Sequence, residues 1–215
     1  TPSRSSAASD VYKRQVVSDI FEQVKLCKIC SDIFSKTKTQ HCPRPVIRGK
    51  STAKILIAGQ APGARVHESG VPFSDPSGDV LRKWMGLSKD DFYDERNIAI
   101  IPMAFCFPGY DEKGSDLPPP KICAATWRSS ILENFQNLEL KLLVGSFAQK
   151  WHLDTNLTVT NVVKDWRLYA PEFLPLPHPS WRNRAWLKKN FWFEKELVPV
   201  LRNKVRGILK NETAK

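Results

Sequence analysis

The sequence predicts an α/β fold built on one parallel sheet. Four short apolar runs recur along the chain, and each ends in or runs into a turn containing glycine or proline; they cover residues 53–59, 97–103, 138–145 and 172–180. Segments with helical periodicity separate these runs. Such alternation is typical of βαβ units, in which the strands lie parallel. The run AKILIAG is apolar on both faces, which indicates a strand covered by helices on both sides.

The helices are predicted from the spacing of apolar residues between these runs. They are expected at residues 16–30, 77–87, 125–137, 146–153 and 185–209. In the second of them Ser77 is placed near the N-cap. The last is amphipathic and contains Pro199, which either kinks it or starts a new segment.

The composition is typical of one globular domain, because 41% of the 215 residues are hydrophobic and 26% are charged. The first fifteen residues are small and polar and resemble translated adaptor sequence. We therefore expect one domain over 16–210, a non-native or disordered leader over 1–15 and a disordered tail over 211–215. No apolar run reaches the roughly 20 residues that span a bilayer. The expectation is a monomeric cytoplasmic protein, associated with the bacterial nucleoid and not with membranes.

The chain is strongly basic, with a net charge of +11 from 33 basic and 22 acidic residues. The same chain carries seven Trp and eleven Phe. Positive charge combined with aromatic side chains suits a nucleic-acid surface. Lysine-rich faces in contact with solvent are the alternative explanation of the charge.

The chain has five cysteines, an odd number, and no sign of secretion, so a disulfide framework is not expected. Cys27 and Cys30 form a C-x-x-C motif, and Cys106 and Cys123 bound a loop stiffened by three consecutive prolines. Four thiolates would suit zinc or an iron–sulfur cluster. Buried structural thiols, or a redox pair at the C-x-x-C, are the alternatives. Cys42 is expected not to be a ligand, although its neighbours His41 and Pro43 leave a regulatory or alternative-ligand role open.

Taken together, five features resemble the uracil-DNA glycosylase superfamily, most closely its iron–sulfur-containing family 4 branch. They are the C-x-x-C, the GQAPG turn at 59–63, GVPF at 70–73, the Cys106 and Cys123 pair, and HPSWRN at 178–183. The resemblance covers about 24–205. It implies a three-layer α/β/α fold with a central four-stranded parallel sheet, DNA as the partner, and a [4Fe-4S] cluster, with zinc as the alternative, on Cys27, Cys30, Cys106 and Cys123.

The resemblance also implies roles for individual side chains in a base pocket. Phe73 matches the aromatic on which a flipped base stacks, and His178 matches the histidine that donates to a uracil carbonyl oxygen. A core phenylalanine and an ordinary polar histidine are the structural alternatives. Ala61, Pro62 and Pro102 occupy the remaining positions of this pocket.

A second group of residues is implied to contact the DNA backbone and duplex. Gly63, Ala64 and Ser180 suit phosphate contacts. Trp181, Arg182 and Asn183 match the loop that probes the duplex or wedges into it. Arg182, with Arg184, Lys188 and Lys189, would supply affinity that falls with salt; an ordinary solvated helix face is the alternative.

The sequence departs from the family pattern at the positions that carry the chemistry. Gln60 stands where family 4 members carry Glu, and a glutamine cannot take a proton from water at neutral pH. Pro102 stands where an asparagine normally reads the uracil edge. The possible substitutes as catalytic base include His67 and Asp75, with Asp75 expected to face the pocket; a turn-forming role before Pro76 is equally open for it.

The function expected from this pattern is that of a DNA glycosylase, which hydrolyses the N-glycosidic bond of uracil or another deaminated or damaged base. Gln60 and His178 would act there, with His67 or Asp75 as base. The alternative is a protein that binds damaged or single-stranded DNA without cutting it. A superfamily member acting on a nucleoside or on RNA is a third possibility.

Overall fold

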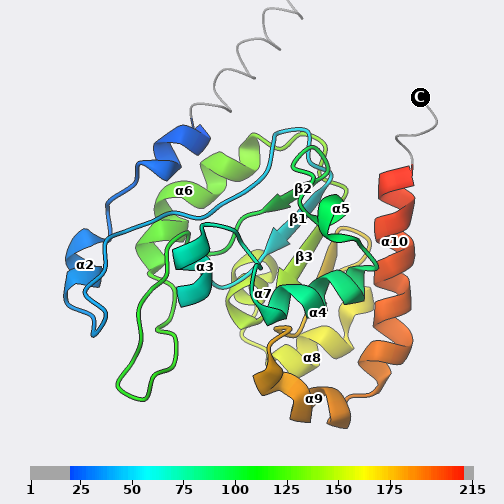
Figure 1. Cartoon of the computed structure of the whole chain (residues 1–215). Helices are drawn as coiled ribbons and strands as arrows, with labels where there is room; N and C mark the ends of the chain where they lie inside the picture. The colour runs from blue at the N-terminus through cyan, green and yellow to red at the C-terminus, as the bar shows by residue number, and fades with distance from the viewer. Residues whose placement is uncertain (1–19, 211–215) are drawn as a thin grey trace, which may run out of the picture.

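The computed structural model describes residues 20–210, and it contains one four-stranded sheet (Figure 1). The strands are β1 (Ile55–Ala58), β2 (Ile98–Ile100), β3 (Leu140–Val144) and β4 (Phe173–Leu176). Their order is β2-β1-β3-β4, and every pair is parallel. The predicted parallel sheet is therefore confirmed. The expected leader, the expected tail and the start of the first expected helix lie outside the described residues.

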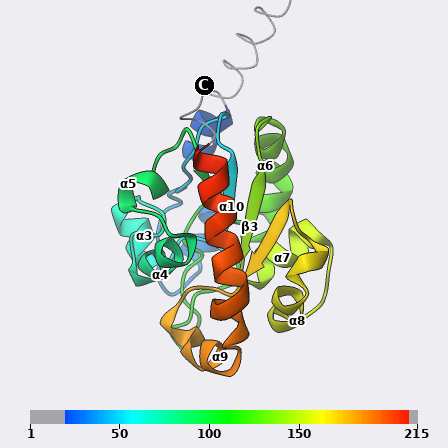
Figure 2. The same cartoon turned by 90° about the vertical axis from the view of Figure 1, so that its right-hand side faces the viewer.

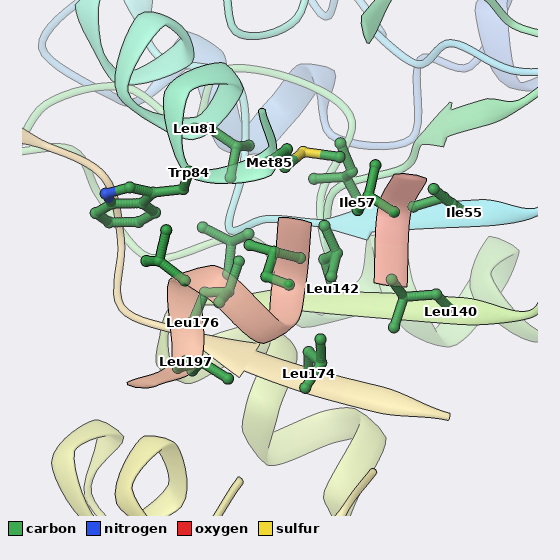
Figure 3. Close-up of a cluster of buried hydrophobic side chains, with 14 of the residues drawn as sticks. Ile55, Ile57, Leu81, Trp84, Met85, Leu140, Leu142, Leu174, Leu176 and Leu197 are labelled. Carbon is green, nitrogen blue, oxygen red and sulfur yellow. The ribbon is translucent and has the colours of Figure 1, made fainter. Parts of the chain in front are cut away.

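Helices cover both faces of the sheet, which gives three layers. Ile55 and Ile57 of β1 point to one face, where they pack with α4 (Pro76–Met85) and α10 (Val198–Lys210). Leu56, between them, points to the opposite face and packs with α6 (Lys121–Glu133). Figure 2 shows α10 running along its face of the sheet, and Figure 3 shows the core beneath it. A strand buried on both faces needs apolar side chains at every position, as the sequence indicated.

The remaining helices are short and lie mostly between the strands. They are α2 (Ser31–Ser35), α3 (Ala64–Ser69), α5 (Lys89–Phe92), α7 (Ser146–Leu153), α8 (Val159–Lys164), α9 (Arg184–Lys189), the 3-10 turns η1 (Trp166–Leu168) and η2 (Trp181–Asn183), and the π-helical segment η3 (Phe193–Leu197). No helix among residues 20–210 is both long enough and apolar enough to cross a membrane.

Several helix boundaries differ from those expected. The N-cap of α4 is Asp75, not Ser77, because Pro76 takes the first helical position and the Asp75 side chain accepts from the next two backbone N–H groups. The expected helix at 185–209 is split into α9, η3 and α10. Pro199 is the second residue of α10, so it starts a segment.

The loops that follow three of the strands converge at the carboxyl edge of the sheet. Backbone hydrogen bonds join the chain after β2 to the turn after β1, from Met103 N to Gly59 O (2.9 Å) and from Ala104 N to Gln60 O (3.0 Å). The end of β3 is joined to β4 by a bond from Gly145 N to the carbonyl oxygen of Leu176. Ligands of open parallel sheets bind at this edge.

Candidate functional site

A cleft of about 90 Å³ lies at the carboxyl edge of the sheet. It is formed by the turn after β1, the segment before α4, the chain after β2 and the loop after β4. The structure brings the following predicted residues together as its lining: Gln60, Ala61, Pro62, Gly63, Phe73, Asp75, Pro102 and His178. Residues far apart in the sequence therefore share one concave site.

Phe73 is held in the cleft by an unusual backbone conformation. Its φ is +54°, in the left-handed region that residues with a side chain rarely adopt. Its ring meets the ring of Phe92 edge-on, with 6.2 Å between centroids. Its carbonyl oxygen accepts a hydrogen bond from Arg82 Nη1 (3.2 Å). A β-carbon on Gly59 would lie 3.6 Å from the tip of the Phe73 ring, so the ring reaches the turn after β1.

Gly78 makes this position of Phe73 possible, because a β-carbon there would lie 1.8 Å from the Phe73 carbonyl oxygen. We predict that Gly78→Ala destabilises the protein by about 1–3 kcal/mol or more through overpacking. Gly207→Ala is the matched control: it lies in α10 with nothing within 4 Å of the added carbon. The control is expected to stabilise the helix by about 0.4–1 kcal/mol. Denaturant unfolding of both variants measures the difference, and equal stabilities would contradict the assignment.

His178 is a nearly buried histidine between two prolines. Burial lowers the pKa of its imidazole, and the neighbouring carboxylate of Asp75 partly opposes this. The ring is therefore neutral at pH 7 and keeps one N–H as a donor. No residue among 20–210 hydrogen-bonds to its ring nitrogens, while its backbone oxygen accepts from Asn183 Nδ2 (2.7 Å). The loop is fixed, and the ring is left available to a ligand.

The GQAPG turn and Pro102 line the cleft from two neighbouring loops. The carbonyl oxygen of Pro102 accepts a hydrogen bond from Arg128 Nη1 (2.9 Å), and Arg128 itself does not line the cleft. Arg128 is fully buried and also donates to Ile101 O (3.0 Å) and to His152 Nε2. It thereby holds the chain after β2 in place. Sequence reasoning missed Arg128, because a basic residue in a predicted helix is normally expected to be exposed to solvent.

The two predicted substitutes for the missing acid lie in different places. Asp75 lines the cleft, where its Oδ1 accepts from Ser77 N (3.1 Å), Gly78 N (3.3 Å) and the Ser77 hydroxyl. Asp75 therefore both caps α4, in line with the turn-forming alternative, and lines the pocket, as expected. His67 does not line the cleft. Its ring lies 5.2 Å from the ring of His41 and 6.0 Å from that of Phe107.

Asp116 is a cleft residue that sequence reasoning missed. It lies on a hairpin closed by bonds from Leu117 N to Gly109 O (2.9 Å) and from Asp111 N to Ser115 O (2.8 Å). Desolvation raises the pKa of its carboxyl group; the Asp75 carboxylate adds to this, and the Arg182 guanidinium opposes it. The available signal was the YDEKGSD stretch, in which Gly114 and the turn-forming Asp111 indicate a hairpin. The sequence alone predicts this stretch only as part of a stiff loop.

The HPSWRN segment forms a rim beside the cleft. The Ser180 hydroxyl caps η2 by accepting from Arg182 N (3.1 Å). Trp181 is 69% exposed, and the Arg182 guanidinium lies 5.7 Å from the centre of its ring. Ala64 is the first residue of α3, and Gly63 precedes it. A large aromatic side chain and a cation therefore project from the edge of the site.

The four predicted cysteine ligands line one cavity, which is separate from the cleft: Cys27, Cys30, Cys106 and Cys123. Burial raises the pKa of the Cys106 thiol to about 12 and that of Cys123 to about 11, and the neighbouring thiols contribute to both shifts. Such thiols stay protonated at neutral pH unless a cation holds them as thiolates. Within residues 20–210, no three His, Cys, Asp or Glu side chains are grouped closely enough to hold a metal ion. Cys42 is exposed.

Comparison with known proteins identifies the family. The family model of the uracil DNA glycosylase superfamily matches residues 46–202. Among solved structures, the chain is similar to the solution NMR structure of a proposed uracil DNA glycosylase from Methanosarcina acetivorans, with 19% identity and a TM-score of 0.42. That match covers 73% of this chain and 93% of the other. The family match includes the turn after β1, the Phe73 segment, the hairpin and the HPSWRN rim, and the chain therefore belongs to the uracil DNA glycosylase superfamily.

Proposed function

We propose that this protein is a DNA glycosylase that hydrolyses the N-glycosidic bond of uracil or another deaminated base in DNA. The observation that carries the proposal is the meeting of Phe73 and His178 in one cleft at the sheet edge. Chemistry on a base requires that the nucleotide leave the stack and enter a pocket. The ring of Phe73 supplies a surface on which such a base can stack.

His178 would stabilise the leaving base. Negative charge grows on the base as the bond to the sugar breaks, and a fixed donor aimed at that charge lowers the barrier. A neutral imidazole N–H meets this need, because the lowered pKa keeps the ring neutral and no described residue hydrogen-bonds to its nitrogens. The fixed loop prevents the ring from having to reorganise during the reaction.

The rim would bind the DNA. Trp181 is exposed and can fill the space that a flipped base leaves in the duplex. Arg182 and the exposed cations of α9 would contact phosphates without reading sequence. Affinity should then fall steeply with salt concentration.

The test is incubation with oligonucleotides that contain uracil, hypoxanthine or xanthine, followed by alkali, which cleaves at abasic sites. Strand cleavage on at least one of them is the expected result. The rival function, binding of damaged DNA without cutting, is favoured by Gln60 and Pro102, which lack the usual acid and amide. Tight binding of a lesion without release of a base would establish the rival.

We further propose a [4Fe-4S] cluster on Cys27, Cys30, Cys106 and Cys123, as in the family 4 branch. Four soft donors facing one cavity with walls such as Phe34 and Trp127 suit this group. Zinc on the same four thiolates is the alternative, and a single zinc ion would hold the four sulfurs at about 2.3 Å from one point. When bound, the cluster would tie the 106–123 loop to the N-terminal segment, and we assign it no part in bond cleavage.

Cluster binding makes a direct prediction. The purified protein should be brown and contain about four iron atoms per chain, and Cys106→Ser should lose the colour. Cys42→Ser is the matched control, because Cys42 is exposed and does not line the cavity. Visible absorption and iron content measure both. A colourless protein with one bound zinc would contradict the proposal.

A further inference from the structure

We propose that Asp116 is the general base of this protein and activates the water that attacks the sugar. This inference rests on the proposed function and names the residue that takes the place of the acid absent at Gln60. It is carried by the position of Asp116 in the cleft that also contains Phe73 and His178.

The hairpin at 109–117 brings Asp116 to the mouth of the cleft. Tyr110 and Asp116 face each other as a bridge pair across it. The base of the hairpin packs closely on the neighbouring loop, since a β-carbon on Gly109 would lie 3.0 Å from Thr37 Cβ. At the mouth, a β-carbon on Gly63 would lie 3.9 Å from Asp116 Oδ2, so the carboxylate approaches the turn after β1. In Figure 1 this green hairpin projects beside α3.

This position suits a base that acts on the sugar. A base stacked on Phe73 with its carbonyl at His178 occupies the interior of the cleft, so its deoxyribose lies toward the mouth. Asp116 as a whole is exposed at the mouth, where water can reach it, although its surroundings partly desolvate its carboxyl group. A general base must lie within hydrogen-bond reach of the water that it deprotonates.

Asp116 is better suited to this role than Asp75. Three donors already bind Asp75 Oδ1, and that arrangement fixes the Asp75 side chain as the cap of α4. Asp116 accepts no side-chain hydrogen bond from residues 20–210, so its oxygens are available to water. The raised pKa of Asp116 also makes it a stronger base than an ordinary aspartate once it is ionised.

The reaction then balances as a hydrolysis. The bond between C1′ and the base nitrogen breaks, and its electron pair leaves on the base, where the N–H of His178 stabilises the charge. The water oxygen bonds to C1′, and Asp116 accepts the proton that this water loses. That proton finally neutralises the base anion, so the products are a free base and an abasic site.

The charged groups that act on Asp116 are Asp75 and Arg182, and they allow the base to be identified from pH profiles, while the neutral ring of His178 lines the same cleft. Excision should decline as pH falls and Asp116 becomes protonated. Asp75→Asn keeps an oxygen acceptor for the cap and removes a negative charge, so it should move this acidic limb to lower pH. Arg182→Gln removes a positive charge and should move the limb to higher pH.

The experiment is single-turnover excision across pH 4–9, on whichever oligonucleotide the wild type cleaves best. Asp116→Asn should lower the rate by about 10²–10⁴-fold, while lesion binding and folding are retained. Asp116→Ala should lose the same activity and regain part of it in formate. Glu112→Gln, an exposed carboxylate on the same hairpin, is the matched control and should match the wild type.

The outcomes separate the two proposals. An active wild type with an equally active Asp116→Asn variant overturns the assignment of the base and leaves the glycosylase function standing. If Asp75→Asn abolishes activity while Asp116→Asn only shifts the acidic limb of the pH–rate profile, Asp75 is the general base and the assignment of Asp116 is overturned. A wild type that releases no base from any oligonucleotide overturns both.

Discussion

His178→Ala should lower the single-turnover rate of base excision by about 10²–10³-fold, the effect of removing one fixed donor to a developing anion. The affinity for intact lesion-containing DNA should change much less, because in the proposed complex the rim, and not this imidazole, would contact the backbone. His67→Gln is the comparison variant, since His67 contacts His41 and Phe107 outside the cleft. Rapid-quench kinetics with enzyme in excess, together with binding by fluorescence anisotropy, separates the two quantities.

If His178→Ala weakens lesion binding as much as it slows excision, the imidazole stabilises the bound ground state and the transition state equally. It then contributes affinity and does not lower the barrier of the chemical step. If His67→Gln is the slower enzyme, the catalytic histidine has been misassigned.

Arg128→Met should destabilise the protein by about 2–5 kcal/mol, the largest loss of stability that we expect from a single polar side chain. The guanidinium is fully buried and donates to two backbone oxygens, those of Ile101 and Pro102, and to His152. Its removal leaves these acceptors buried without a donor, and each such group costs about 1–3 kcal/mol. Arg206→Met, an exposed change on α10, should stay within about 0.5 kcal/mol of the wild type. The midpoints of denaturant unfolding test both variants. Equal midpoints for Arg128→Met and the wild type would show that water hydrogen-bonds to the carbonyl oxygens of Ile101 and Pro102 once the guanidinium is removed.

The contact between Arg128 and His152 predicts that the stability of the protein depends on pH. Burial, followed by the positive charges of Arg128 and Lys141, lowers the pKa of His152 to about 3. The unfolded chain binds a proton near the ordinary value of 6.5 and the folded chain does not, so stability is fully present above pH 6.5 and is lost as pH falls toward 3. The loss at pH 5 is about 2 kcal/mol.

His152→Gln should remove this part of the acid sensitivity, because an amide oxygen can accept from Arg128 without binding a proton. Unfolding free energies at pH 5 and pH 8 measure the effect. An unchanged difference between the two pH values would place the acid sensitivity elsewhere.

The sheet could be predicted because its signals are local. A strand buried on both faces, such as Ile55–Ala58, must be apolar throughout, and the turn that follows it must contain residues suited to a tight bend. Phe73 and His178 could be placed in one site for two different reasons. His178 follows β4, whose carboxyl end lies at the ligand-binding edge of the parallel sheet, whereas Phe73 is assigned to the pocket by the resemblance of GVPF to the family motif.

The features that were missed depend on tertiary neighbours. Arg128 resembles a surface residue in the sequence, and only the approach of the chain after β2 makes it a buried donor. Asp116 lies on a hairpin whose base, at Gly109, approaches Thr37 from a distant part of the sequence. Asp75 illustrates a third case, in which two interpretations of one residue both hold: it caps α4 and lines the cleft.

The measurement that tests the central claim most directly is the release of radiolabelled uracil from a single-stranded or duplex oligonucleotide, with the wild-type protein in excess. The claim is that the cleft between Phe73 and His178 holds a flipped base and lets it depart. It predicts free uracil and an intact strand that breaks only in alkali. Binding of the oligonucleotide with all of the label still attached to the sugar would contradict it.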